Sequence, residues 1–98
     1  MRRLPGGSAN PPKLEVYWTS QAEQDRKYWQ KHDRRFLTRI DRLIADVQDH
    51  PFTGIGKPEP LRYEWSGYWS RRISDEHRLV YRVEAETVFI AQCRFHYD

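Results

Sequence analysis

The hydrophobic pattern of this chain changes abruptly at Pro51. Before that residue, apolar side chains recur at the three- and four-residue spacing of a helix. After it, apolar and polar residues alternate in short segments separated by turn-forming residues. The two periods place side chains at different angles around the backbone, so one stretch of sequence satisfies only one of them. The chain is therefore predicted to fold as an α+β domain, with two helices first and a sheet second.

The first helix is predicted to begin at Ser20. Ser20 and Glu23 have the spacing of a capping box, in which the two side chains bond the free amides of a helix start. The helix is expected to run to about Lys31, with Tyr28 and Trp29 facing inward.

A second helix is predicted to follow Asp33, whose carboxylate suits a helix cap. It is expected to end near His50, because Pro51 disfavours helical geometry in the residue before it. Its apolar side chains share one face at helical spacing; they are Phe36, Leu37, Ile40, Leu43, Ile44 and Val47. Both helices are expected to pack on one face of the sheet.

The other segments predict a small, mainly antiparallel, twisted sheet. Residues 14–18 alternate and indicate an edge or early strand, and further strands are expected at residues 68–73, 78–83 and 88–95. Alternation assigns an apolar face to Leu79, Tyr81, Val83, Phe89, Ala91, Cys93 and Phe95. Cys93 is therefore interpreted as a core residue rather than a nucleophile. The opposite, more polar face is assigned Arg78, Val80, Arg82, Ile90, Gln92, Arg94 and His96.

Composition bounds the size and the location of the protein. Ninety-eight residues, 14% of them aromatic, suit one domain at residues 14–98. Residues 1–13 are interpreted as a flexible basic leader, which lacks the apolar stretch of a secretory signal. Its three basic residues account for the whole net charge of +3, so overall charge does not argue for a nucleic-acid partner. A single cysteine and the absence of any apolar run of the ~20 residues that span a membrane favour a cytoplasmic protein.

Four motifs follow one another in the second half of the chain. They are Gly56-Lys-Pro-Glu-Pro-Leu61, Ser66-Gly-Tyr-Trp-Ser-Arg-Arg-Ile73, Glu76-His-Arg-Leu-Val-Tyr81 and Cys93-Arg-Phe-His-Tyr97. Through these motifs, residues 14–97 resemble the Txe/YoeB family of toxins from type II toxin–antitoxin systems, within the RelE/ParE superfamily. The resemblance implies a RelE/ParE-like fold and cleavage of messenger RNA at the ribosomal A site. It also implies a YefM-like antitoxin and a homodimer. Contact with ribosomal RNA is a separate hypothesis, based on Arg35, Arg39 and Arg42 at helical spacing on the outer face of the second helix.

The matching positions imply a metal-independent ribonuclease mechanism. Glu59 matches the family's proposed base, His96 its general acid, and Arg78 the arginine that steadies the scissile phosphate. These residue types suit attack by the RNA's own 2′-hydroxyl, which requires proton transfer and stabilising cations. No cofactor is expected, because the histidines lack zinc spacing and no carboxylates cluster as a magnesium site requires.

Further arginines divide into two groups. Arg62 and Arg72 are expected to contact the RNA, and Tyr97 is expected to stack on a base. For Arg71, Arg82 and Arg94 the sequence favours ordinary surface charge.

Two alternatives to the nuclease stay open. A ParE-like toxin would share the fold but inhibit DNA gyrase without cutting RNA, and it would need no acid–base pair. The presence of both Glu59 and His96 therefore favours the nuclease. An inactive relative that serves only as an antitoxin-binding module is the second alternative.

Overall fold

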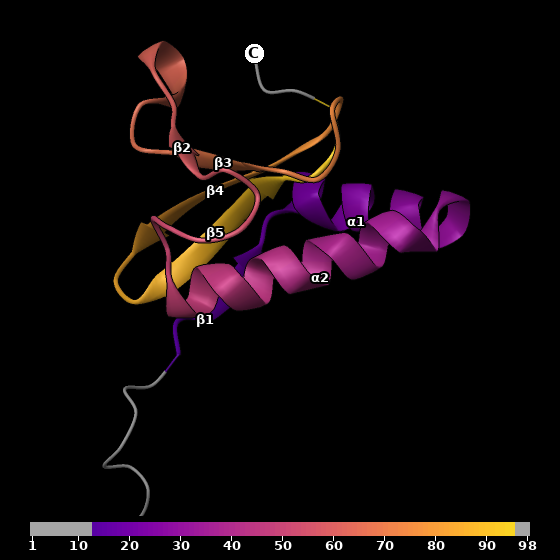
Figure 1. Cartoon of the computed structure of the whole chain (residues 1–98), viewed down its shortest axis with the longest axis horizontal. Helices are drawn as coiled ribbons and strands as arrows, with labels where there is room; N and C mark the ends of the chain where they lie inside the picture. The colour runs from indigo at the N-terminus through magenta and orange to yellow at the C-terminus, as the bar shows by residue number, and fades with distance from the viewer. Residues whose placement is uncertain (1–12, 96–98) are drawn as a thin grey trace, which may run out of the picture.

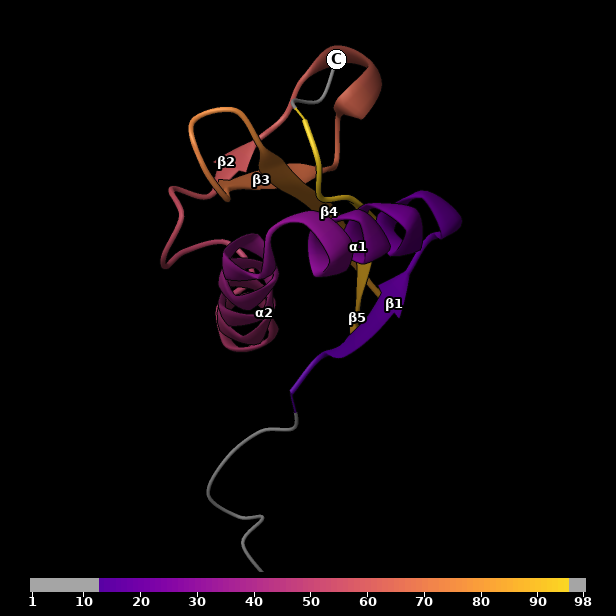
Figure 2. The same cartoon turned by 90° about the vertical axis from the view of Figure 1, so that its right-hand side faces the viewer.

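Two helices lie against one face of a five-stranded sheet (Figure 1, Figure 2). The structure is a computed structural model, and it describes residues 13–95. In chain order the elements are β1 (Glu15–Trp18), α1 (Ser20–His32), α2 (Arg34–Asp49), β2 (Glu59–Pro60), a 3₁₀ helix (Tyr63–Trp65), β3 (Trp69–Arg72), β4 (Arg78–Glu84) and β5 (Thr87–Gln92). The predicted α+β class is confirmed. Of the predicted leader, residues 1–13, only Lys13 lies within the described residues.

The sheet has the order β1-β5-β4-β3-β2. β1 runs parallel to β5, while the other neighbouring strands are antiparallel, so the sheet is mixed. β1 is an edge strand, as predicted, and the first and last strands of the chain lie side by side (Figure 1). The structure adds the short edge strand β2 around Glu59, where the sequence predicts no strand.

Both helices begin at a side chain that caps them. Asp33 caps α2 as predicted, accepting a bond from the Arg35 amide at 3.1 Å. For α1 the predicted capping residue, Ser20, is wrong: Thr19 is the cap, and its hydroxyl accepts from the Ala22 amide at 3.1 Å. The same hydroxyl donates to the Ala91 carbonyl at 3.0 Å. Thr19 thus fixes the start of α1 to β5, a contact between distant segments that no local spacing rule contains.

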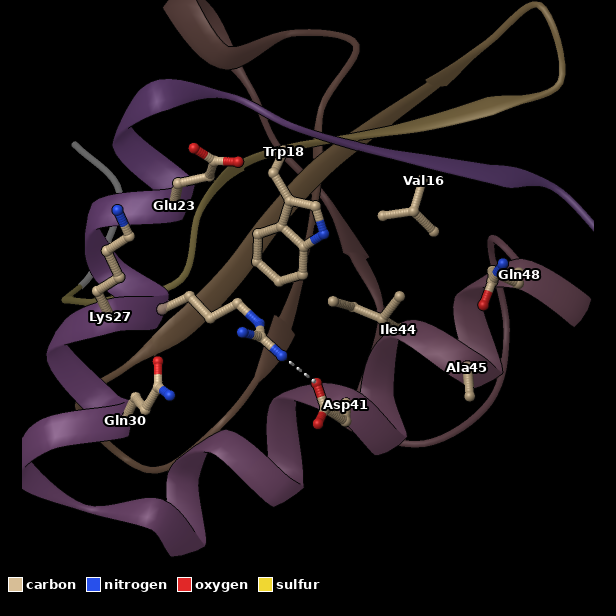
Figure 3. Close-up of a pocket in the computed structure, with 10 residues that line it drawn as sticks. Val16, Trp18, Glu23, Lys27, Gln30, Asp41, Ile44, Ala45 and Gln48 are labelled. Carbon is tan, nitrogen blue, oxygen red and sulfur yellow. Dashed lines mark ion pairs between the residues drawn. The ribbon is translucent and has the colours of Figure 1, made fainter.

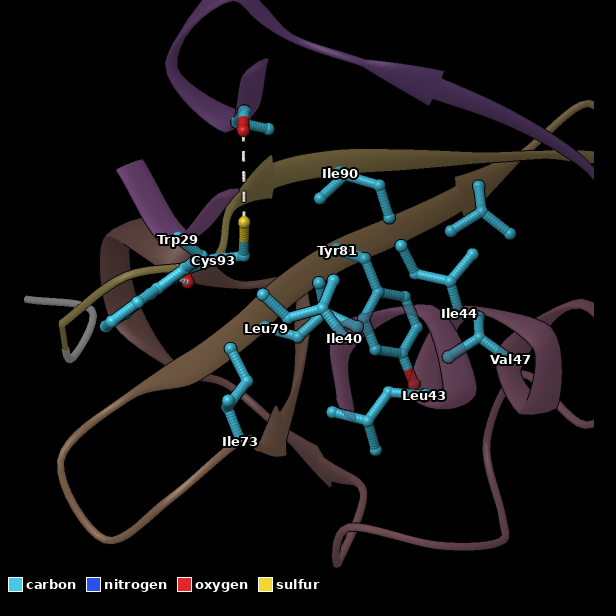
Figure 4. Packing of buried hydrophobic residues seen from close by; sticks show 12 residues of the cluster. Trp29, Ile40, Leu43, Ile44, Val47, Ile73, Leu79, Tyr81, Ile90 and Cys93 are labelled. Atoms are coloured by element: carbon cyan, nitrogen blue, oxygen red, sulfur yellow. Dashed lines mark hydrogen bonds between the residues drawn. The ribbon is translucent and has the colours of Figure 1, made fainter. Parts of the chain in front are cut away.

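The core lies between α2 and the central strands (Figure 4). From α2, Ile40, Leu43, Ile44 and Val47 are buried, and Phe36 and Leu37 pack partly against them, as the helical spacing predicts. From the sheet, the cluster includes Leu79, Tyr81, Val88 and Ile90.

The predicted faces of the last strand are wrong because β5 contains an extra residue. Val80 lies opposite Gln92 and Tyr81 opposite Ile90, which leaves Ala91 as a bulge. A bulge shifts the alternation by one residue. Ile90 is therefore buried on the helix side, whereas Phe89 lies opposite Arg82 on the other face. Cys93 still reaches the core, because it follows the bulge, and burial raises the pKa of its thiol to about 12.

β5 ends at Gln92, three residues earlier than predicted, because side chains of α1 bind the backbone of Cys93. The Asp25 carboxylate accepts from the Cys93 amide at 3.0 Å, and the Trp29 indole donates to the Cys93 carbonyl at 2.8 Å. With both backbone groups bonded to the helix, the ladder cannot continue. Phe95, predicted to face the core, is instead 57% exposed.

Arg71 is fully buried, so its interpretation as a surface charge is wrong. Its guanidinium donates to the Asp46 carboxylate at 2.5 Å and to the Tyr81 hydroxyl at 3.1 Å. It also donates to three carbonyls of the segment between α2 and β2, those of His50, Thr53 and Ile55. A buried guanidinium requires this many acceptors, and here the fold supplies them from α2, β4 and the connecting segment.

Replacing Arg71 should unfold the protein more readily than replacing its exposed neighbour. Arg71→Met leaves the Asp46 carboxylate and three carbonyls without their donor, so we expect a loss of about 3–5 kcal/mol in the free energy of unfolding. Arg72→Met is the matched control and should change it by no more than about 0.5 kcal/mol. Urea titration of both variants measures the difference, and equal stability would show that the buried network contributes nothing.

Asp46 should make stability depend on acid pH. Burial acts to raise the pKa of this carboxyl, but bonds from Arg71 and the Ile55 amide outweigh it and lower the pKa below its usual range. A lowered carboxyl pKa stabilises the folded state above about pH 4 and ceases to do so as the pH falls through the folded-state value. Asp46→Asn should therefore be less stable than the parent at neutral pH, with a gap that narrows by about pH 3. If the difference in the free energy of unfolding between the parent and Asp46→Asn is the same at neutral pH and at about pH 3, the lowered pKa of Asp46 is wrong.

Candidate functional site

The helix-free face of the sheet brings together the predicted site residues of β2, β3 and β4. Glu59 of β2 lies opposite Ser70 of β3, and Arg72 lies opposite Arg78 of β4. Residues opposite one another in a ladder point to the same face, and alternate residues share it. Because Arg71 points to the helix side, Ser70 and Arg72 point away from it. Glu59, Arg72 and Arg78 therefore occupy one face.

Glu59 stands at the edge of this face, beside a hollow of about 610 Å³. Pro58 and Pro60 flank it, which fixes the local backbone and removes two amide donors. The residues that line the hollow are Glu59, Pro60, Leu61, Arg62, Tyr63, Glu64 and Trp65. Glu59 and Arg62 are both exposed in it. An exposed carboxylate next to an exposed guanidinium gives the hollow a proton acceptor and an anion ligand.

Arg78 is held by the turn that precedes it. Its Nη1 donates to the carbonyls of Ser74 at 2.7 Å, Asp75 at 3.1 Å and His77 at 3.2 Å. These bonds orient the guanidinium without neutralising it, since carbonyls carry no net charge. Arg72 is exposed, and its backbone is fixed by an amide bond to the Gly56 carbonyl at 2.7 Å.

The last described residue, Phe95, is anchored beside Arg78. The Phe95 amide donates to Nδ1 of His77 at 2.7 Å, and the Arg78 amide donates to the Phe95 carbonyl at 3.1 Å. His77 is itself buried, with Trp29 and Phe36 packed edge-on against its ring. The predicted acid His96 and the predicted stacking residue Tyr97 lie outside the described residues. His77 is not among the predicted site residues, and in the sequence only its place in the Glu76–Tyr81 motif points to it.

Of the two other arginines interpreted as surface charge, Arg94 is packed against aromatic rings, whereas Arg82 lies at the surface. The guanidinium carbon of Arg94 lies 3.4 Å from the centroid of the Tyr28 ring and 4.4 Å from that of Phe95. Stacking of this kind is a cation–π contact, and it packs Arg94 onto α1. Arg82 remains at the surface, where it forms an ion pair with Glu84.

A second hollow, of about 550 Å³, opens between α1, α2 and β1 (Figure 3). Trp18 and Ile44 form part of its wall, and an ion pair between Arg26 and Asp41 spans it at 3.9 Å. Arg26 also lies 5.5 Å from the centroid of the Trp18 ring. This hollow is on the helix side of the sheet, so it is separate from Glu59.

Within residues 13–95, no three His, Cys, Asp or Glu side chains are grouped closely enough to hold a metal ion. None of the helices described for the chain has the length and apolar character needed to cross a membrane.

Known proteins resemble the chain over most of its length. A family model for YoeB-like toxins of bacterial type II toxin–antitoxin systems matches residues 18–97. Toxin YoeB of Escherichia coli K12 is 48% identical over 84 residues, which cover 86% of this chain and 100% of that protein. Toxin YoeB of Mycobacterium bovis is 52% identical over 82 residues, covering 84% of this chain and 96% of that protein.

Solved structures agree with this likeness. The YoeB/ParE toxin from Agrobacterium tumefaciens superimposes with a TM-score of 0.83 at 45% identity, covering 86% of this chain and 100% of that one. The YoeB dimer from Staphylococcus aureus gives 0.81 at 40% identity, covering 88% and 100%. The match of the family model and the identity of the relatives lead to one conclusion: the chain belongs to the family of YoeB-like toxins of bacterial type II toxin–antitoxin systems.

Proposed function

We propose that this toxin is a ribosome-dependent endoribonuclease that cuts messenger RNA at the ribosomal A site without a metal ion. The observation that carries the proposal is the position of Glu59, an exposed carboxylate on a proline-flanked strand, on the same sheet face as Arg72 and Arg78. This face offers a base and two cations to a bound phosphodiester. Membership of the YoeB-like family supports the same chemistry.

The proposed reaction uses the RNA's own hydroxyl as the nucleophile. Glu59 takes the proton of the 2′-hydroxyl while that oxygen forms a bond to the adjacent phosphorus. The bond from phosphorus to the 5′-oxygen breaks, and His96 supplies the proton that this leaving oxygen needs. The products are a 2′,3′-cyclic phosphate and a 5′-hydroxyl, so every proton is accounted for.

Arginines are proposed to stabilise the charge that gathers on the phosphate during attack. Arg78 is the main candidate, because the three carbonyls that hold it keep its charge and fix its direction. Arg72 and Arg62 are proposed to bind neighbouring phosphates, since both are exposed on or beside the same face. Tyr97 is proposed to stack on a base of the bound RNA.

An antitoxin similar to YefM is the proposed protein partner. The Staphylococcus aureus relative in the solved YoeB–YefM complex is 39% identical to this chain, with a TM-score of 0.79. A homodimer is proposed on the same ground, because the solved relative from that organism is described as a dimer. The ribosome, through its RNA, is the proposed platform on which the message is presented.

Neutralising the proposed base or acid should abolish cleavage while binding to the ribosome survives. Glu59→Gln and His96→Gln should each slow single-turnover cleavage by about 10²–10⁴-fold, because general acid–base groups contribute that much. Glu64→Gln is the matched control: it removes an exposed carboxylate from the same hollow and should cleave normally. Messages whose scissile nucleotide carries a 2′-deoxy sugar should bind and stay intact. Normal cleavage of the deoxy message would exclude the 2′-hydroxyl as nucleophile, and no cleavage by the parent chain would favour the gyrase-inhibiting or inactive alternative.

His77 should act as a positioning residue through Phe95. His77→Phe keeps an aromatic ring against Trp29 and Phe36 but leaves the Phe95 amide without its acceptor, at a cost of about 1–3 kcal/mol. We expect kcat to fall about tenfold, because Phe95, the residue before His96, loses one of the two backbone bonds that hold it. KM for the ribosome should not change. His77→Asn, which retains an acceptor near the Nδ1 position, should recover most of the activity. An unchanged kcat in a folded His77→Phe variant would show that this anchor has no part in catalysis.

A further inference from the structure

A row of flat side chains crosses the helix-free face from the edge strand β1 to the hollow beside Glu59. We call it the aromatic row; its members are Tyr17, Phe89, Arg82, Tyr68 and Trp65. The first three come from β1, β5 and β4, which are adjacent strands (Figure 1). Tyr68 directly precedes β3, and Trp65 ends the 3₁₀ helix.

Sheet register places the strand members of the row side by side. Tyr17 lies opposite Phe89, and Phe89 lies opposite Arg82. Ile90, next to Phe89, is buried on the helix side, so Phe89 points to the other face. Tyr81, next to Arg82, is buried among the same core residues, so Arg82 also points to the helix-free face.

Neighbouring members of the row interact with one another. The ring centroids of Tyr17 and Phe89 are 5.6 Å apart, and the guanidinium carbon of Arg82 lies 4.3 Å from the Phe89 centroid. Arg82 also interacts with the side chain of Tyr68, whose ring lies 5.1 Å from that of Trp65. Trp65 lines the hollow that contains Glu59. The row is therefore continuous with the candidate catalytic site.

The row is partly accessible to a ligand: Tyr17 is exposed, and the other members are half-buried. Tyr17 is 55% exposed, although it belongs to a strand, and the side chain of Arg82 is 33% exposed. Aromatic side chains of strands usually stabilise the fold by being buried. The exposed ring of Tyr17, at the end of the row, does not contribute in this way. Arg82 is ion-paired with Glu84, which leaves its flat surface rather than its charge as the feature available for binding.

We propose that the aromatic row binds the bases of single-stranded RNA next to the nucleotide that is cut. This inference rests on the proposed ribonuclease function and adds a binding track to it. Bases stack on aromatic rings and on guanidinium planes whatever their sequence, since each base has a flat face. Arg72, exposed on the same face, supplies charge for the phosphates. The track starts at Trp65, beside Glu59, and runs across three strands to Tyr17.

The test measures binding of an RNA that cannot be cut. The probe is a fluorescein-labelled RNA dodecamer of mixed sequence with 2′-O-methyl sugars, titrated with the full chain and followed by fluorescence anisotropy. Tyr17→Thr should weaken binding about fivefold, and Tyr17→Thr combined with Phe89→Thr about twentyfold or more, as the loss of one and two stacking contacts predicts. The control Phe52→Thr removes a ring that is 48% exposed but packs against Trp69, outside the row, and should bind like the parent.

Two results would overturn the proposal. One is unchanged RNA affinity in a folded Tyr17→Thr variant. This substitution should disturb folding less than Phe89→Thr, because the side chain of Tyr17 is more exposed than that of Phe89. The other is a shift of oligomeric state in sedimentation without any change of RNA affinity, which would make the row an interface between copies of the chain. Cleavage of messenger RNA on ribosomes is measured separately, for the parent chain and for Glu59→Gln. If the parent does not cut RNA but the row variants still lose affinity, the ribonuclease function fails while the binding track stands.

Discussion

The guanidinium of Arg71 determines how the chain passes from its helices to its sheet. It lies on β3 with no exposed surface, and its bonds reach α2 through Asp46 and β4 through Tyr81. The segment between α2 and β2 has no regular structure of its own up to Pro58, and three of its carbonyls converge on this one side chain. Without the cation these carbonyls would lose their donor beside the half-buried carboxylate of Asp46. The path of the segment, and with it the start of β2, therefore depends on Arg71.

Glycine allows this segment to approach the network closely. A side chain at Gly54, whose φ is +116°, would collide with the Asp46 carboxylate. A Cβ at Gly56 would come within 2.7 Å of the Leu43 side chain and 3.2 Å of Arg71. The Gly56 carbonyl in turn accepts the amide of Arg72. Tight packing next to β3 thus places Glu59 three residues later at the edge of the face that holds Arg72 and Arg78.

The features that could be predicted are those determined by neighbouring residues. The buried face of α2 follows from its own spacing, and its end follows from Pro51. The faces of β5 could not be derived in this way, since the bulge at Ala91 depends on its pairing with β4 and on the bond from Thr19. Arg71 was misjudged for the same reason, because its five acceptors come from three separate parts of the chain. At the candidate site, the motif was enough to propose Glu59, whereas the bond between His77 and Phe95 joins residues eighteen positions apart and follows from no local pattern.

The parallel pairing of β1 with β5 has a consequence for the timing of folding. Among the described strands β1 has one neighbour, and that neighbour is synthesised last. The contacts of Asp25 and Trp29 with Cys93 join the same two ends of the chain. A nascent chain can form its helices early, but it cannot add β1 to this sheet until β5 has been made. The helix-free face, which carries Glu59, Arg72 and Arg78, is thus completed later than the helices that cover the other side of the sheet.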